Sequence, residues 1–118
     1  MLSALHESIR EPNAAFISPQ RLARALNINA TRLSEGMGVH RNTLRNPQSE
    51  ALQAKMRDIA RIVARAETLM GGRERAVYWL HNQPIVDLGG MTAWELVAKG
   101  HTSAVAAFLD AFDDGPLG

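Results

Sequence analysis

The chain contains no cysteine, and it has no long uninterrupted run of apolar residues. Without cysteine it can form no disulfide framework and perform no thiolate chemistry, so we expect a reducing, cytoplasmic environment. No window approaches the roughly 18 apolar residues that a membrane-spanning helix needs. The first residues carry charges and have no cleavage-like end, so we expect neither a secretory signal nor a membrane partner.

The sequence also lacks the patterns that accompany catalysis. Its histidines are scattered, no two of them lie four residues apart on a helix, and no carboxylates accompany them in a metal-site pattern. No glycine-rich phosphate loop follows a strand, because strand-like alternation is nearly absent. We therefore expect no enzyme activity, no metal site and no cofactor. The histidines are His6, His40, His81 and His101.

Apolar residues recur at helical spacing through most of the 118 residues, which indicates an all-α fold. Ser18 followed by Pro19 is a strong helix start. Gly38 breaks a short helix, and Pro47 prevents the next one from continuing. We expect helices at about 19–27, 30–37, 40–46, 49–70, 73–82, 92–100 and 102–112. They are expected to form an N-terminal helix-turn-helix bundle, a long linking helix and a small C-terminal helical bundle, over residues 1–48, 49–72 and 73–118.

Charge is distributed unevenly along the chain. Residues 1–75 hold 12 Lys and Arg against 7 Asp and Glu, a net charge of +5, while residues 76–118 hold 1 against 5, a net charge of −4. Eleven of the thirteen basic residues are arginine, whose planar guanidinium suits phosphates and guanine edges. The two halves are therefore expected to face different partners or each other, and solvated helix faces are the alternative reading.

The segment MGVHRNTLRN, residues 37–46, has the features of a helix-turn-helix. A glycine at the turn, a hydrophobe after it and apolar anchors on both helices let the second helix project into the major groove. Subtracting the inward positions Leu33, Met37, Val39 and Leu44 leaves an outward face without acids. Any two packed helices joined by Gly-Val would look similar, and Pro47 limits the reach of the second helix. The predicted DNA-binding residues are His40, Arg41, Asn42, Thr43, Arg45, Asn46 and, flanking them, Arg32.

The second half of the chain carries a more distinctive pattern. It combines a helix ending in Trp-Leu, a proline loop that closes in Leu-Gly-Gly, a helix with a Thr-x-x-Glu capping box, and a glycine before a last helix. This pattern resembles the toxin-binding domain of Xre/MbcA/ParS-type antitoxins. Ile85 and Ala93 depart from it, since the family commonly has asparagine and proline there. The matching residues are Ala76, Trp79, Leu80, Pro84, Leu88, Gly90, Thr92, Glu95, Leu96, Gly100, Val105 and Leu109.

With the preceding helix-turn-helix, the resemblance covers about residues 18–112. It implies an antitoxin that neutralises a toxin acting on NAD or transferring ADP-ribose, and that represses its own operon by binding promoter DNA. A homodimer is expected, because one short recognition helix buries too little surface for specific affinity. The alternative is a stand-alone dimeric helix-turn-helix repressor without a toxin partner. The expected toxin-binding region includes Trp79, Pro84, Leu88, Gly90, Trp94, Gly100, Asp110, Asp113 and Asp114. Most of Trp79, Trp94 and Phe108 are nevertheless expected to be buried within the C-terminal bundle.

Overall fold

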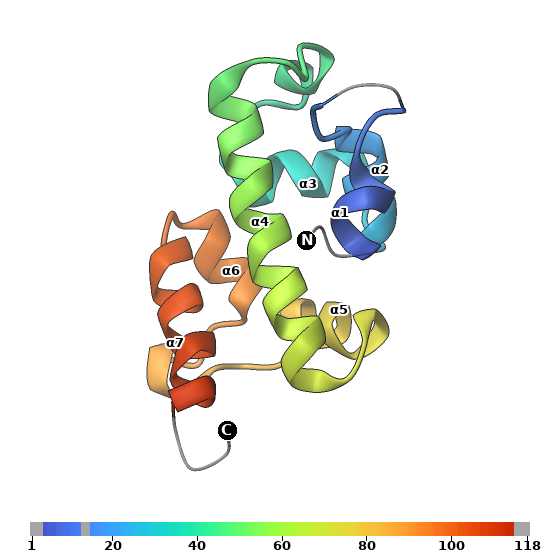
Figure 1. Ribbon diagram of the computed structural model, residues 1–118. Coiled ribbons are helices and arrows are strands. Elements are labelled where there is room, and N and C mark those ends of the chain that lie inside the picture. The colour runs from blue at the N-terminus through green and yellow to red at the C-terminus, as the bar shows by residue number, and fades with distance from the viewer. Residues whose placement is uncertain (1–3, 13–14, 115–118) are drawn as a thin grey trace. The chain divides into compact units, whose positions relative to one another are not determined.

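The computed structural model describes residues 4–12 and 15–114, with only the backbone of residues 113 and 114 (Figure 1). The all-α prediction is confirmed: within these ranges every regular element is a helix, and two isolated β-bridges, Arg10 with Ile17 and Ile85 with Met91, are the only strand-like pairs. The elements in chain order are α1 (Ala4–Ile9), α2 (Pro19–Ala25), α3 (Ala30–Met37), the 3-10 helix η1 (Arg41–Arg45), α4 (Glu50–Met70), α5 (Arg73–Asn82), the 3-10 helix η2 (Val86–Leu88), α6 (Ala93–Ala98) and α7 (Thr102–Asp114).

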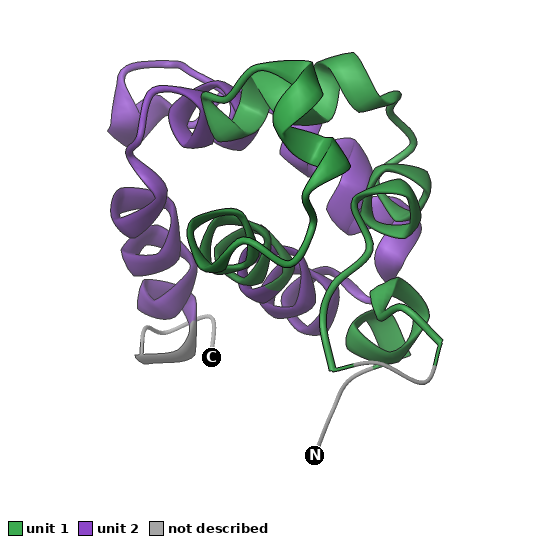
Figure 2. Cartoon of the chain, turned by 90° about the horizontal axis from the view of Figure 1, so that it is seen from above, with its two compact units in different colours: residues 1–60 green, residues 61–118 purple. Residues whose placement is uncertain are grey.

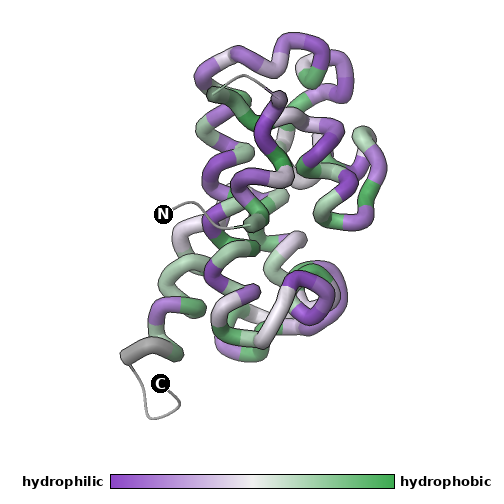
Figure 3. Tube along the Cα trace, turned by 45° about the vertical axis from the view of Figure 1, so that its right-hand side comes forward, coloured by the Kyte–Doolittle hydropathy of each residue, from purple (hydrophilic) through white to green (hydrophobic). Residues whose placement is uncertain are grey.

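The chain divides into two compact units, residues 1–60 and residues 61–118, shown in different colours in Figure 2. The boundary falls inside α4, so each unit contains about half of this 21-residue helix. Apolar and polar residues alternate along the helices in Figure 3, as expected for helices that bury one stripe and leave the other in water.

Unit 1, residues 1–60, is built around apolar side chains from all of its α-helices. Leu5, Ile9, Leu22, Leu26 and Leu33 have no exposed surface. As predicted, Ser18 caps α2, because its hydroxyl accepts a hydrogen bond from the Arg21 amide at 3.2 Å. The cap fixes the first turn of α2, the helix that carries Arg21 and Arg24.

Unit 2, residues 61–118, has its own core, to which Leu80 of α5, Trp94 of α6 and Val105 and Leu109 of α7 contribute. The capping box at the start of α6 is confirmed, with both reciprocal hydrogen bonds present. Residues 83–91, expected as a plain loop, contain the single turn η2. The last helix runs to Asp114, two residues beyond the end expected from the sequence.

The second helix of the expected helix-turn-helix differs from the prediction. Residues 40–46 were expected to be a helix, and the structure has a five-residue 3-10 helix from Arg41 to Arg45. Gly38 ends α3 in the left-handed conformation, with φ of 68°, and Pro47 follows only two residues after Arg45. His40 is the extended cap residue and Asn46, directly before Pro47, has non-helical dihedral angles, so only residues 41–45 remain for the helix, and 3-10 geometry suits such short pieces.

Candidate nucleic-acid interface and protein-binding surface

Helices α2 and α3 form a closely joined pair in unit 1. The turn between them, residues 26–29, places Asn27 in the left-handed conformation with φ of 61°, where asparagine is tolerated better than most residues. Asn29 then caps α3, because its Oδ1 accepts a hydrogen bond from the Arg32 amide at 2.8 Å. The turn and the cap together fix the point at which α3 leaves α2.

All seven residues of the predicted DNA-binding face are exposed, and Leu44, the fourth residue of η1, is buried, with 6% of its surface exposed. The start of η1 is held by His40, whose Nδ1 accepts a hydrogen bond from the Asn42 amide at 3.1 Å. Leu44 therefore anchors η1 while its polar residues face solvent. Binding of DNA by these residues stays a prediction.

One contact links η1 to the exposed side of α3. The Arg41 guanidinium donates to the Thr31 hydroxyl at 3.4 Å, ten residues earlier in the chain. Thr31 and its neighbour Arg32 are both exposed on α3. The structure thus joins Arg41 of the predicted face to the helix that carries Arg32, and Thr31 was not singled out from the sequence.

The residues of the expected toxin-binding region are not gathered on one exposed surface. Trp94 is buried and contacts His81 edge to face, while Trp79 is half-buried and stacks on Phe108 with ring centroids 6.5 Å apart. Leu88 is also half-buried, whereas Pro84, Gly90 and Gly100 are exposed. The two tryptophans therefore serve mainly the packing of unit 2.

The three acidic residues expected near the C-terminus have different positions. Asp110 is exposed and pairs with Arg65, its Oδ1 lying 3.4 Å from the Arg65 Nε. Asp113 and Asp114 end α7, but their side chains lie outside the described residues. Asp110 is thus already engaged within unit 2, at an exposed position where such a pair is weak.

Two exposed apolar side chains were missed by the sequence reasoning. Val86 of η2 is 85% exposed and Tyr78 of α5 is 65% exposed. Val86 sits on a closed loop: the Ile85 amide donates to the Met91 carbonyl at 2.8 Å, and the Gly90 amide donates to the Ile85 carbonyl at 2.9 Å. Because Ile85 is only 3% exposed, the loop buries one apolar residue and presents the next to solvent. The sequence did offer a signal for this exposure: Val86 is an apolar residue in a tight turn, and the turn does not require an apolar residue there.

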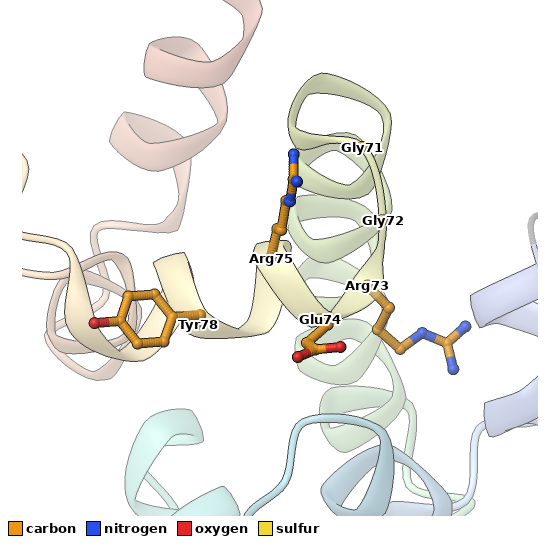
Figure 4. Close-up of a pocket in the computed structure, with 6 residues that line it drawn as sticks. All are labelled: Gly71, Gly72, Arg73, Glu74, Arg75 and Tyr78. Carbon is orange, nitrogen blue, oxygen red and sulfur yellow. The ribbon is translucent and has the colours of Figure 1, made fainter.

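A pocket at the start of α5 is lined by Gly71, Gly72, Arg73, Glu74, Arg75 and Tyr78. Figure 4 shows that the side chains of Arg73 and Tyr78 point in opposite directions and that Arg75 points away from both. Arg73 also pairs with Glu67, with the Nε and Oε2 atoms 3.2 Å apart. Its polar groups do not converge on one point, so the pocket offers no binding constellation.

One carboxyl group in unit 2 has a shifted pKa. The pKa of Glu95 lies below its usual value of 4.5, mainly because the backbone amide of Thr92 donates to the carboxylate. The Thr92 hydroxyl and the charge of Lys99 act in the same direction. This carboxylate is part of the capping box and therefore has a structural task.

In the described part of the chain, no group of three or more histidines and carboxylates could hold a metal ion. None of the helices in this part is both long and apolar enough to span a bilayer.

Comparison with known proteins gives one match. A family model, the antitoxin Xre/MbcA/ParS C-terminal toxin-binding domain, matches residues 65–115. No curated protein and no solved structure matches the chain. The matched segment lies entirely within unit 2.

Proposed function

We propose that this chain is an antitoxin of the Xre/MbcA/ParS family that neutralises a toxin acting on NAD or transferring ADP-ribose, because residues 65–115 match the toxin-binding domain of that family. The observation that carries the proposal is the match of a toxin-binding domain to one compact unit of the chain. We further propose that unit 1 binds promoter DNA in the cytoplasm and so represses the operon.

The charge and exposure of unit 1 support the DNA-binding part. Residues 18–49 hold five arginines and a single acid, Glu35. Arg32, Arg41 and Arg45 are all exposed, and the Arg41–Thr31 contact joins η1 to α3. Exposed arginines in a segment with a single acid favour phosphate contacts, and hydroxyl and amide groups among them can reach base edges. We propose that α3 and η1 together face the duplex.

Salt-dependent DNA binding tests this part. The affinity of the wild-type protein for its own upstream DNA and for a random-sequence duplex is measured over a series of salt concentrations. Each phosphate contact contributes about 0.9 to the magnitude of the slope of log K against log salt concentration, so the Arg41→Ala/Arg45→Ala variant is expected to reduce that magnitude by about 1.8 for each bound protomer. The matched control, Arg75→Ala/Lys99→Ala, removes the same charge from exposed positions in unit 2. An equal loss in both variants would show that only net charge matters and would refute the proposed face.

The proposed toxin-binding surface includes Tyr78 and the loop of residues 85–91, which carries Val86. An apolar side chain on a loop that is closed by backbone hydrogen bonds loses less conformational freedom on binding, and such residues are typical anchors of protein interfaces. Both residues lie inside the matched domain. The half-buried aromatic residues and Asp110 remain candidates around this surface.

Co-purification with the product of the adjacent reading frame tests the toxin partner. Val86→Asp is expected to weaken the complex at least tenfold while leaving unit 2 folded, because Val86 contributes almost nothing to the core. Ser103→Asp, which adds the same charge at an exposed position in the first turn of α7, is the control. Equal complex formation by both variants would exclude Val86 from the interface.

A homodimer is part of the proposal, since specific operator binding by one short element needs a second half-site. Sedimentation of the free protein and of its DNA complex measures the stoichiometry. If the protein binds its upstream DNA as a dimer but no neighbouring gene product co-purifies, the stand-alone repressor is the better description.

A further inference from the structure

Gln53 on α4 is one of three buried polar residues in the described part of the chain, with 5% of its surface exposed. A buried amide is costly unless its hydrogen-bonding groups are satisfied. Its partners therefore show what it contributes to unit 1.

The Gln53 side chain forms hydrogen bonds with two backbone segments at once, at Ile17, which is 36 residues away in sequence, and at Pro47. Its Oε1 accepts from the Ile17 amide at 2.9 Å, and its Nε2 donates to the Ile17 carbonyl at 2.9 Å. The same Nε2 donates to the Pro47 carbonyl at 2.6 Å. Both donor hydrogens and the acceptor are thus used, and the amide pairs with Ile17 as a neighbouring strand would.

Both segments lead directly into basic elements. Ile17 precedes Ser18, the cap of α2, which carries Arg21 and the exposed Arg24. Pro47 lies just beyond η1, which carries Arg41 and Arg45. Hydrogen bonds are directional, so this amide fixes where α2 begins and where η1 ends more tightly than apolar packing alone.

We propose that Gln53 is a positioning residue for the nucleic-acid interface, setting the spacing between the arginines of α2 and those of η1 so that both reach phosphates of one duplex. The inference rests on the proposed DNA binding of unit 1. Gln53 itself is buried and touches no DNA. It acts through Ile17 and Pro47.

The geometry explains why glutamine is needed at this position. Asparagine is shorter by one methylene group and cannot span both segments. Methionine fills a similar volume without any strong hydrogen bond. Glutamate keeps the acceptor for the Ile17 amide but, when ionised, places an oxygen against the two carbonyls that Gln53 satisfies.

The test measures the salt slope of binding to a random-sequence DNA duplex. If the two sets of arginines lose their spacing, one or two phosphate contacts are lost in each protomer, so Gln53→Met is expected to reduce the magnitude of the slope by about 0.9 to 1.8 for each bound protomer. Gln48→Met, the same chemical change at an exposed position beside Pro47, is expected to keep the wild-type slope. A lower folded fraction that is the same at every salt concentration reduces the affinity equally and leaves the slope unchanged, so the folded fraction of each variant is measured by far-UV circular dichroism at each salt concentration.

Gln53→Glu provides a second variant with a pH readout. Burial raises the pKa of a carboxyl group, and a protonated carboxyl can donate one of the lost hydrogen bonds. The slope of this variant is expected to return toward the wild-type value, measured at the same pH, as the pH is lowered to about 5. Far-UV circular dichroism follows folding, and tryptophan fluorescence reports unit 2 alone, because residues 1–60 contain no tryptophan or tyrosine.

The outcomes are distinguishable. A reduced slope in Gln53→Met with an unchanged slope in Gln48→Met supports the positioning role. A wild-type slope in both Gln53 variants, whatever the drop in affinity, shows that Gln53 only stabilises unit 1 and overturns the inference. Absence of salt-dependent binding by the wild-type protein overturns the proposed DNA binding and, with it, this inference.

Discussion

Replacing Thr92 by alanine removes one side of the capping box that starts α6. The Thr92 hydroxyl accepts a hydrogen bond from the Glu95 amide at 3.2 Å, and the Glu95 carboxylate accepts one from the Thr92 amide at 3.0 Å. Because α6 has only six residues, its first turn is a large part of the helix. Loss of a threonine cap typically destabilises a protein by about 1 kcal/mol, and we expect this value for the free energy of unfolding of unit 2.

Thermal unfolding followed by tryptophan fluorescence measures this loss. Both tryptophans lie in unit 2, and Trp94, two residues after Thr92, is 5% exposed, so its emission changes when α6 unfolds. A loss of about 1 kcal/mol lowers Tm by about 4–8 °C in a domain of this size. Thr92→Ser keeps the hydroxyl and is expected to stay close to the wild type. An unchanged Tm in Thr92→Ala would refute the assignment of the helix start to this box.

The capping box also predicts a pH dependence with a definite sign. The Thr92 amide lowers the pKa of Glu95 in the folded state below 4.5, so the ionised carboxylate stabilises the fold above pH 4.5. This contribution is lost as the pH falls from 4.5 through the lower folded pKa. The difference in Tm between wild type and Glu95→Gln should therefore shrink in acid. A difference that stays constant from neutral pH to well below 4.5 would contradict the reasoning.

Two further substitutions test the local geometry of unit 1. Asn27 has φ of 61°, so Asn27→Gly is expected to be tolerated and Asn27→Val to destabilise unit 1 by about 1–2 kcal/mol, measured by far-UV circular dichroism during thermal unfolding. Leu44 anchors η1 with 6% of its surface exposed, so Leu44→Ala is expected to cost about 2–5 kcal/mol and to weaken DNA binding. Asn42→Ala, at an exposed position of the same element, should change the free energy of unfolding by less than about 0.5 kcal/mol. Equal losses of stability in the two variants would exclude the anchoring role of Leu44.

Helix ends that are set by residues nearby in the sequence were predictable. Ser18 with Pro19, Gly38, and Thr92 with Glu95 each act within one helical turn, and the structure has the expected cap or stop at each. Local hydrogen bonds and backbone preferences are enough to decide such positions. The all-α class follows from the same kind of signal.

Features that depend on contacts beyond one helical turn were not predictable in this way. The partners of Gln53 include a residue 36 positions away, and no local pattern indicates that pairing. The 3-10 form of η1 reflects the short stretch that remains between Gly38, which ends α3, and Pro47. The exposure of Val86 follows from the loop closing on Met91, which directs Ile85 inward.

The position of the unit boundary bears on how the protein should be divided for experiments. The boundary lies between Ala60 and Arg61, inside α4, and the matched toxin-binding domain begins at residue 65. Arg65 on α4 pairs with Asp110 on α7, so the second half of α4 contributes contacts to unit 2. A fragment that begins after Met70 would lose these contacts together with Ala66, which is 1% exposed. A fragment intended to keep toxin binding should therefore begin no later than Arg61, because the end of α4 belongs to the same core as the helices that follow it.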